Sequence, residues 1–159
     1  MDPRVTPSIE DRIAFDDLYS SYLWALDTKD VEFYVAAFWD DAVLHETQVD
    51  GTVLKFEGRE AIDQFTRDMF ALPEWVGHQH RETTRLYVPE GDSAQERWFA
   101  QSYWFTTHRD DPTNSVEILS TGYYRDIVEK RDGEWRFASR WIERWRSDAR
   151  HPYRHDGIA

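Results

Sequence analysis

The hydrophobic periodicity of the chain changes at Pro73, and this change constrains the fold more than any other feature of the sequence. Before Pro73, apolar residues recur mainly at helical spacing, whereas the residues after it form long strand-like segments separated by short turns. Proline suits the end of a helix, because it has no amide N–H and clashes with the preceding turn. Helices first and antiparallel strands afterwards predict an α+β fold.

Capping residues and turn dipeptides set the expected boundaries of the elements. Ser8 and Asp30 can each cap a helix, and Asp50-Gly51 is suited to a tight hairpin turn. The expected elements are, in order, a helix over about 9–27, a helix over 31–38, a hairpin over 42–58, a helix over 59–72, and strands over 78–88, 94–107, 116–129 and 134–146.

The last expected strand alternates between aromatic and arginine residues. Successive side chains of a strand point to opposite faces. This alternation places Arg140 in a row of arginines, which is usually a solvated face, and leaves an aromatic face that fits burial between subunits. The aromatic face comprises Trp135, Phe137, Trp141 and Trp145, and the opposite face comprises Arg136, Ala138, Arg140, Ile142, Arg144 and Arg146.

Length and charge restrict the class of protein. A chain of 159 residues is expected to form one domain, with a core over about 9–146 and a tail over 147–159. The net charge of -12 argues against nucleic acid and against an anionic membrane as partners. Cysteine is absent, no apolar run approaches the ~20 residues of a membrane span, and the amino terminus lacks the apolar stretch of a signal peptide. We therefore expect a cytoplasmic protein.

The aromatic content is unusually high, at 16% of the residues. Aromatic rings suit the walls of a cavity for a cyclic apolar molecule, because they bring large apolar area at little entropic cost. They can equally fill the core and a subunit interface, and composition does not separate the two. The residues considered as cavity walls are His78, Trp104, Trp24, Phe56 and Trp75.

Asp27 and His80 form a candidate base with its orienting carboxylate. Asp27 lies where a helix should end, at the negative pole of its dipole, where a carboxylate is disfavoured unless it has a partner. The alternative is a solvated aspartate that begins a turn. Tyr22 lies about 140° around the helix from Asp27, so spacing alone does not place the two on one face.

His78 and His80 alternate on a strand, which sends both rings to the same side. If that side is a cavity, one ring can act as a base and the other as a wall. With His45 and Glu46 they could instead begin a metal site, but the sequence supplies no compact ligand motif. Chemistry without a metal or a cofactor is therefore preferred.

Several segments resemble the SnoaL-like branch of the nuclear-transport-factor-2-like superfamily over about residues 9–146. They are IEDRIAFDDLYSSYLWALDTKD, AAFWDDAVLHETQ, FEGREAIDQF, GHQHRETTRLYV and DGEWRFASRWIER. The resemblance implies a cone-shaped α+β barrel, in which a curved, mostly antiparallel sheet wraps around three helices and leaves a deep pocket.

Within that superfamily, the chain resembles three enzyme types: scytalone dehydratase, bile-acid 7α-dehydratase and hexachlorocyclohexane dehydrochlorinase. The resemblance implies that His80 is the base, that Asp27 orients it, and that Tyr22 and Arg140 steady the developing charge. Residues 102–105 offer neither the second histidine nor the acid that the two dehydratases carry on the next strand. Tyr22 is therefore the candidate proton donor.

The resulting expectation is a lyase or isomerase that acts on a cyclic apolar molecule without a cofactor. Two alternatives stay open: a polyketide-type cyclase or epoxide hydrolase in the same pocket, and a non-catalytic binding or assembly subunit like the small subunit of ring-hydroxylating dioxygenases. Resemblance to the dehydratase-like members also implies a homo-oligomer, with a trimer favoured.

Overall fold

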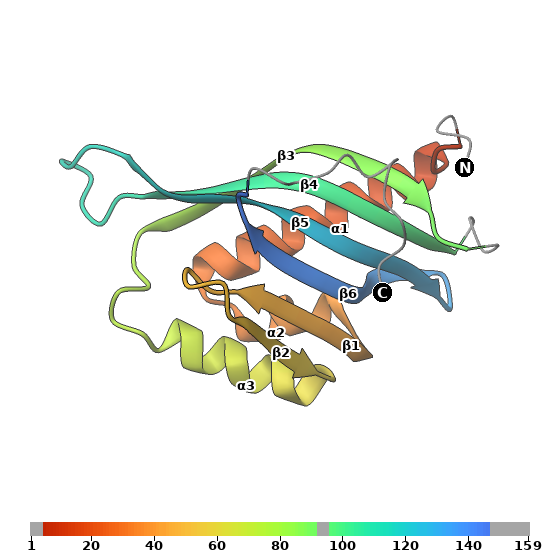
Figure 1. The fold of residues 1–159 in the computed structure, drawn as a ribbon, viewed down its shortest axis with the longest axis horizontal. Coiled ribbons are helices and arrows are strands. Elements are labelled where there is room, and N and C mark those ends of the chain that lie inside the picture. Colours follow the sequence, from red (N-terminus) through yellow and green to blue (C-terminus); the bar gives the residue numbers. More distant parts are fainter. Residues whose placement is uncertain (1–4, 92–95, 147–159) are drawn as a thin grey trace.

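Helices and strands follow one another in the expected order within residues 5–91 and 96–146, which are the residues that the computed structural model describes (Figure 1). The predicted tail, 147–159, lies outside the described residues. The elements are α1 (Ile9–Thr28), α2 (Val31–Ala36), β1 (Phe38–Thr47), β2 (Val53–Glu57), α3 (Arg59–Phe70), β3 (His78–Pro89), β4 (Arg97–His108), β5 (Glu117–Arg131) and β6 (Glu134–Arg144).

The described strands form one curved sheet in the order β2-β1-β6-β5-β4-β3. Neighbouring strands are antiparallel except β1 and β6, which run parallel, so the first strand after the helices joins the last strand of the chain. The predicted α+β cone with a mostly antiparallel sheet is confirmed. The sheet does not close into a barrel, because β2 and β3 are its two edges.

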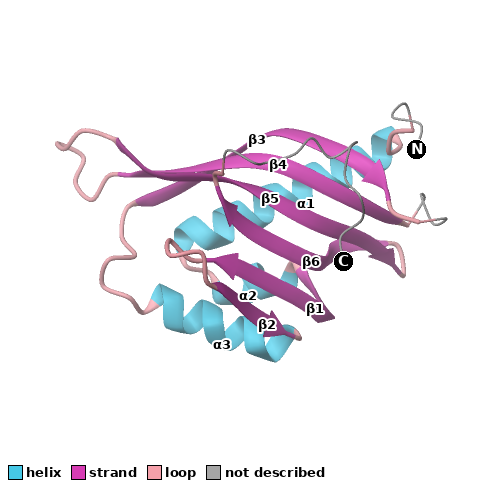
Figure 2. Ribbon diagram, in the orientation of Figure 1, coloured by secondary structure: helices cyan, strands magenta, loops and turns pink. Residues whose placement is uncertain are grey.

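The three helices lie along one side of the sheet, as Figure 2 shows. The core forms between them, where α1 contributes buried residues at helical spacing: Phe15, Tyr19, Tyr22 and Leu26. Phe137 of β6 packs edge-on against Tyr19 and Tyr22, with ring centroids 5.1 and 5.6 Å apart. This packing fixes α1 against the sheet and sets where each of its side chains points.

Local hydrogen bonds explain the first helix boundaries. The Ser8 hydroxyl accepts a hydrogen bond from the Asp11 amide at 3.0 Å, and the Asp30 carboxylate accepts one from the Phe33 amide at 3.1 Å. Each bond satisfies an amide that the helix itself leaves free. α2 ends two residues earlier than predicted, because Phe38 already pairs with Phe137 as the first residue of β1.

A β-bulge in β6 overturns the predicted faces of that strand. Ile127 of β5 pairs with Ser139 and Val128 pairs with Phe137, so Ala138 is an extra residue on β6. The residues of β6 after the bulge therefore point to the face opposite to the one that simple alternation predicts. Phe137 and Arg140 both point to the helix-covered face, and Trp141, which was predicted to share a face with Phe137, points to the other face, where it stacks on His45 at 3.7 Å.

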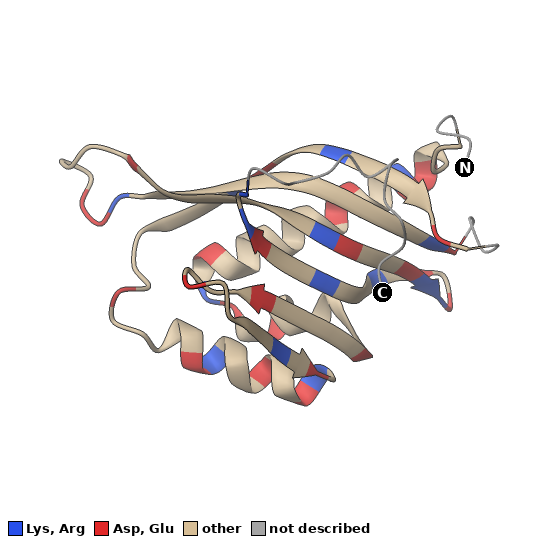
Figure 3. Cartoon of the chain, viewed as in Figure 1, with Lys and Arg blue, Asp and Glu red and all other residues tan. Residues whose placement is uncertain are grey.

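Positively and negatively charged residues are interspersed along the sheet and the helices, as the colours of Figure 3 show for one view. In the part of the chain that the structure describes, no helix is long and apolar enough to cross a membrane.

Gly122 of β5 allows a close approach of Trp104. A methyl group placed on Gly122 would lie 1.9 Å from the Glu143 carbonyl oxygen and 2.5 Å from the Trp104 ring. We expect Gly122→Ala to destabilise the protein by about 1 to 3 kcal/mol, because the backbone or the indole must move. Urea unfolding would measure this loss, with Ser120→Ala on the same strand as the control. Equal stability of wild type and Gly122→Ala would contradict the close packing.

Candidate active site

A cavity of about 330 Å³ lies between the helices and the sheet, and all three helices and five of the strands contribute to its walls. Its apolar lining residues are Leu26, Val49, Phe65, Met69, Trp75, Trp104, Leu119 and Ile142. Its polar lining residues are Tyr22, Tyr34, Glu46, His78, His80, Thr106, Ser120, Tyr124 and Arg144. A cavity with apolar and aromatic walls and convergent polar groups is the usual form of a small-molecule site.

His80, near the start of β3, is in direct contact with Asp27, near the carboxyl end of α1. The His80 Nδ1 lies 2.6 Å from the Asp27 Oδ1, and the His80 backbone amide donates to both carboxylate oxygens at 3.0 Å. Their side chains are 9% and 18% exposed, respectively. These bonds give the helix-end carboxylate the partner that its position requires, and they hold β3 against α1.

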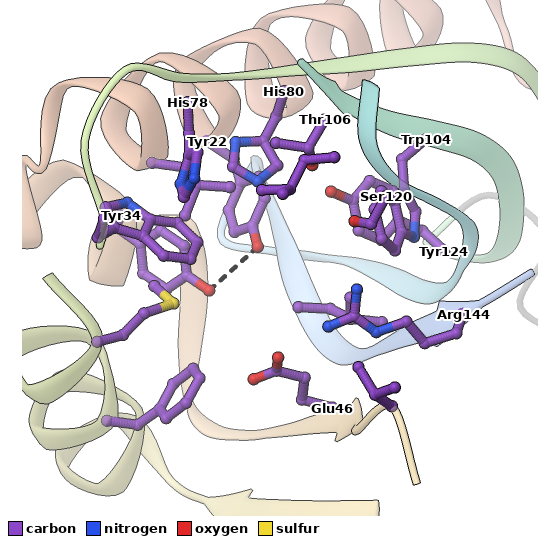
Figure 4. Close-up of a pocket in the computed structure, with 17 residues that line it drawn as sticks. Tyr22, Tyr34, Glu46, His78, His80, Trp104, Thr106, Ser120, Tyr124 and Arg144 are labelled. Atoms are coloured by element: carbon purple, nitrogen blue, oxygen red, sulfur yellow. Dashed lines mark hydrogen bonds between the residues drawn. The ribbon is translucent and has the colours of Figure 1, made fainter. Parts of the chain in front are cut away.

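The hydrogen bond to Asp27 defines the orientation of the imidazole. A carboxylate only accepts, so Nδ1 carries the shared proton and a neutral ring has its lone pair on Nε2. His80 lines the cavity, where its ring stacks on Trp75 with centroids 5.7 Å apart. Figure 4 shows the His80 ring directed into the cavity. The geometry thus presents a basic nitrogen to a bound molecule.

Tyr22 and Tyr34 place two phenols in the same cavity. Their hydroxyl oxygens are 3.0 Å apart, as the dashed line in Figure 4 marks. Burial raises the pKa of Tyr22, although the positive charge of Arg140 and the hydrogen bond to Tyr34 oppose the shift. Burial also raises the pKa of Tyr34 well above its ordinary value. Both phenols are therefore hydrogen-bond donors at neutral pH.

Arg140 lies behind Tyr22, outside the cavity. The guanidinium carbon is 3.8 Å from the ring centroid of Tyr124, 4.1 Å from that of Tyr22 and 4.4 Å from that of Phe137, and the residue is fully buried. Its Nη1 is 3.7 Å from the Asp126 carboxylate. Arg140 is therefore not among the residues that line the cavity, because the bulge turns its side chain into an aromatic enclosure.

The carboxyl group beside Arg140 is equally buried. Asp126 accepts a hydrogen bond from the Tyr19 hydroxyl at 2.7 Å. Burial raises the pKa of Asp126 to about 6, with the charge of Arg140 and the bond from Tyr19 acting in the opposite direction. The attraction of Asp126 raises the pKa of Arg140 despite its own burial, so the guanidinium keeps its charge. A fixed cation thus stands directly behind the Tyr22 ring.

Three of the predicted cavity walls line the cavity: His78, Trp75 and Trp104. Burial lowers the pKa of His78, and the neighbouring His80 and His108 lower it further. His78 therefore stays neutral near pH 7, beside the edge of Trp75 at a centroid distance of 4.8 Å. These residues give the cavity a flat aromatic boundary.

Trp24 and Phe56 lie outside the cavity, contrary to prediction. Trp24 is 71% exposed, because it sits about 200° around α1 from Tyr22 and so points away from the sheet. Phe56 stacks on Phe65 with centroids 4.1 Å apart, and only Phe65 of the two reaches the cavity.

The sequence interpretation missed Glu46 and Arg144 as cavity residues. Ser120 and Thr106 were also not singled out, and their hydroxyl groups add to the polar part of the wall. Burial raises the pKa of Glu46, while Arg144 and a hydrogen bond from Gln48 act in the opposite direction. The signal that could have found Glu46 is its alternation with Leu44, which is fully buried on the helix-covered face.

The metal-site alternative fails on geometry. His45 and Glu46 are adjacent on β1 and point to opposite faces, His45 toward Trp141 and Glu46 into the cavity. Within residues 5–91 and 96–146, no three His, Asp or Glu side chains are grouped in a way that could hold a metal ion.

Comparison with known proteins places this architecture in context. The sequence model of the SnoaL-like domain matches residues 7–141. No curated protein sequence matches the chain.

Solved structures share the fold across almost the whole chain. A cystatin-like-fold protein of unknown function from Nostoc punctiforme is 23% identical, with a TM-score of 0.71 over 90% of this chain and 97% of its own. A putative scytalone dehydratase from Novosphingobium aromaticivorans is 20% identical, with a TM-score of 0.69 over 90% of each chain. ActVI-ORFA from Streptomyces coelicolor is 17% identical, with a TM-score of 0.74 over 91% of this chain and all of its own.

Proposed function

The chain belongs to the SnoaL-like domain family, and from this premise we propose that it is a cofactor-independent lyase for a cyclic, largely apolar small molecule. The observation that carries the proposal is the 2.6 Å contact between the Asp27 carboxylate and the His80 ring at the wall of an aromatic cavity. In the proposed reaction, Nε2 of His80 removes a proton from a carbon next to an activating carbonyl group.

Tyr22 and Tyr34 would stabilise the negative charge that develops on the carbonyl oxygen. Both keep their protons at neutral pH, and both are held in place by packing before a substrate binds. Because one hydroxyl donates to the other, one phenol would donate to the carbonyl oxygen and the second would support it through their mutual hydrogen bond. Donors fixed in a water-poor site act strongly on developing charge, because they need no reorganisation during the reaction.

Arg140 would act through Tyr22 as a positioning residue. Its charge opposes the effect of burial on the pKa of Tyr22, which makes the phenol a better donor than burial alone would allow. The aromatic enclosure excludes solvent, so this charge is weakly screened.

The fold comparison supports the same class of reaction. One of the structures with this fold is named as a putative scytalone dehydratase, a name that denotes loss of water from a substrate. The aromatic walls of Trp75 and Trp104 suit a flat ring, and the cavity volume of about 330 Å³ suits a molecule of one to three fused rings.

The proposed function is tested with monocyclic, bicyclic and tricyclic ketones that carry a hydroxyl group on the carbon β to the carbonyl. For α-tetralone with this hydroxyl group, loss of water yields an enone that tautomerises to a fluorescent naphthol. The expected result is faster formation of the unsaturated product than in buffer, or exchange of the α hydrogen of the unreacted ketone for solvent deuterium through reversible proton removal. If no compound of the series shows either effect, the proposed function is wrong.

A further inference from the structure

Glu46 is the one carboxylate among the described residues that line the cavity. It lies near the end of β1, two residues after the buried Leu44, and pairs with Ile142 of β6 and Leu54 of β2. Figure 4 shows Glu46 and Arg144 on the side of the cavity away from His80, both pointing into it. A molecule in the cavity would therefore have His80 on one side and Glu46 on the other.

The surroundings of Glu46 oppose the ionisation of its carboxyl group. The charged and titratable groups that line the cavity with it are Arg144 of β6, Tyr124 of β5, Tyr22 of α1, Tyr34 of α2, and His78 and His80 of β3. Only Arg144 among these is a permanent cation. Burial outweighs its attraction and raises the pKa of Glu46 above its ordinary value.

We propose that Glu46 is the general acid of this site and that the leaving hydroxyl group of the β-hydroxy ketone receives its proton from Glu46. This inference rests on the proposed function, and it replaces Tyr22 as the proton donor. The hydrogen-bonded pair of Tyr22 and Tyr34 is then free to bind the carbonyl oxygen. Arg144 acts as a positioning residue for the Glu46 carboxylate and the departing water.

The step balances without any further reactant. Nε2 of His80 takes the α proton, the electrons of the C–H bond form the carbon–carbon double bond, and the carbon–oxygen bond to the β hydroxyl breaks. The proton of Glu46 goes to that hydroxyl, which leaves as water. The cycle ends with a protonated His80 and an ionised Glu46, and exchange of one proton through solvent restores both groups.

The test compares two leaving groups on the same ring: α-tetralone with a hydroxyl group on the β carbon, and the acetate ester of that compound. Hydroxide leaves poorly without a proton, whereas acetate leaves without one. We expect Glu46→Gln to lower the turnover of the hydroxyl compound by about 10²-fold and to leave that of the acetate unchanged. Glu57→Gln, which changes an exposed glutamate of β2, is the matched control and should affect neither compound.

The outcomes separate this inference from the proposed function. Equal effects of Glu46→Gln on both compounds, whether a loss or no change, would overturn the role of Glu46 as proton donor. Turnover of the acetate should still depend on His80, because proton removal is common to both reactions. If the wild-type protein accelerates neither compound, the proposed function is contradicted. The protonation state of Glu46 is then measured directly, without an activity assay.

A carbon-13 NMR titration of protein labelled at the glutamate carboxyl carbons gives that independent readout. The signal that disappears in Glu46→Gln should titrate at a pH clearly above the other glutamates. Arg144→Met should move it to still higher pH, because Arg144 lowers the pKa of Glu46 in the wild type. A Glu46 signal that titrates with the ordinary glutamates would overturn the inference, since the group would then be ionised at neutral pH.

Discussion

Replacing His80 by Gln is expected to lower turnover by about 10²- to 10⁴-fold, the usual contribution of a general base. Glutamine keeps much of the volume of the ring, and the backbone amide of residue 80 can still donate to Asp27. The fold should therefore persist while the basic nitrogen is lost. The measurement is turnover of the β-hydroxy ketone series, with circular dichroism and thermal unfolding to verify the fold.

His45→Gln is the matched control for His80. His45 also lies in a strand, but on the outer face of the sheet, where it stacks on Trp141. Its replacement should leave turnover unchanged. Wild-type turnover in His80→Gln, on a compound that the parent converts, would show that His80 is not the base.

Asp27→Asn is expected to lower turnover by about 10²- to 10⁴-fold, although it changes a group that does not touch the substrate. The carboxylate accepts from Nδ1 of His80, whereas an amide can turn its NH2 group toward that nitrogen. The amide then favours the tautomer with the proton on Nε2, which cannot accept a proton from the substrate. Turnover and the ring nitrogen signals of His80 in nitrogen-15 NMR would measure the two effects.

Asp17→Asn provides the control for this change on the same helix. Asp17 is exposed on α1, so its replacement should alter neither turnover nor the His80 signals. Loss of activity in Asp27→Asn with the tautomer unchanged would contradict the orienting role. A purely structural role of Asp27 would appear instead as reduced stability with normal turnover of the folded fraction.

The fold was predictable from the sequence because its local signals agree with one another. Ser8 and Asp30 cap the helices as expected, and the turn at Asp50-Gly51 precedes β2 as expected. The contact between Asp27 and His80 was predicted from family resemblance, and helical or strand spacing alone does not bring together residues that lie 53 positions apart.

The site was less predictable, because it depends on which face each side chain occupies. Trp24 was taken for a cavity residue by its type, whereas the rotation of α1 turns it to solvent. Glu46 was grouped with its neighbour His45, although adjacent residues of a strand point to opposite faces. Burial, which raises the pKa of Glu46, arises only from the packing of the complete structure.

The single additional residue at position 138 has a consequence for the comparison of this chain with its relatives. Beyond Ala138, the side that each residue of β6 occupies depends on whether a homologue keeps the same bulge. In a relative without the bulge, the residue equivalent to Trp141 would point to the helix-covered face and the residue equivalent to Arg140 to the opposite face, even where the amino acids are identical. Equivalent residues in this strand should therefore be identified by structural superposition, because a sequence alignment can equate residues from opposite faces of the sheet.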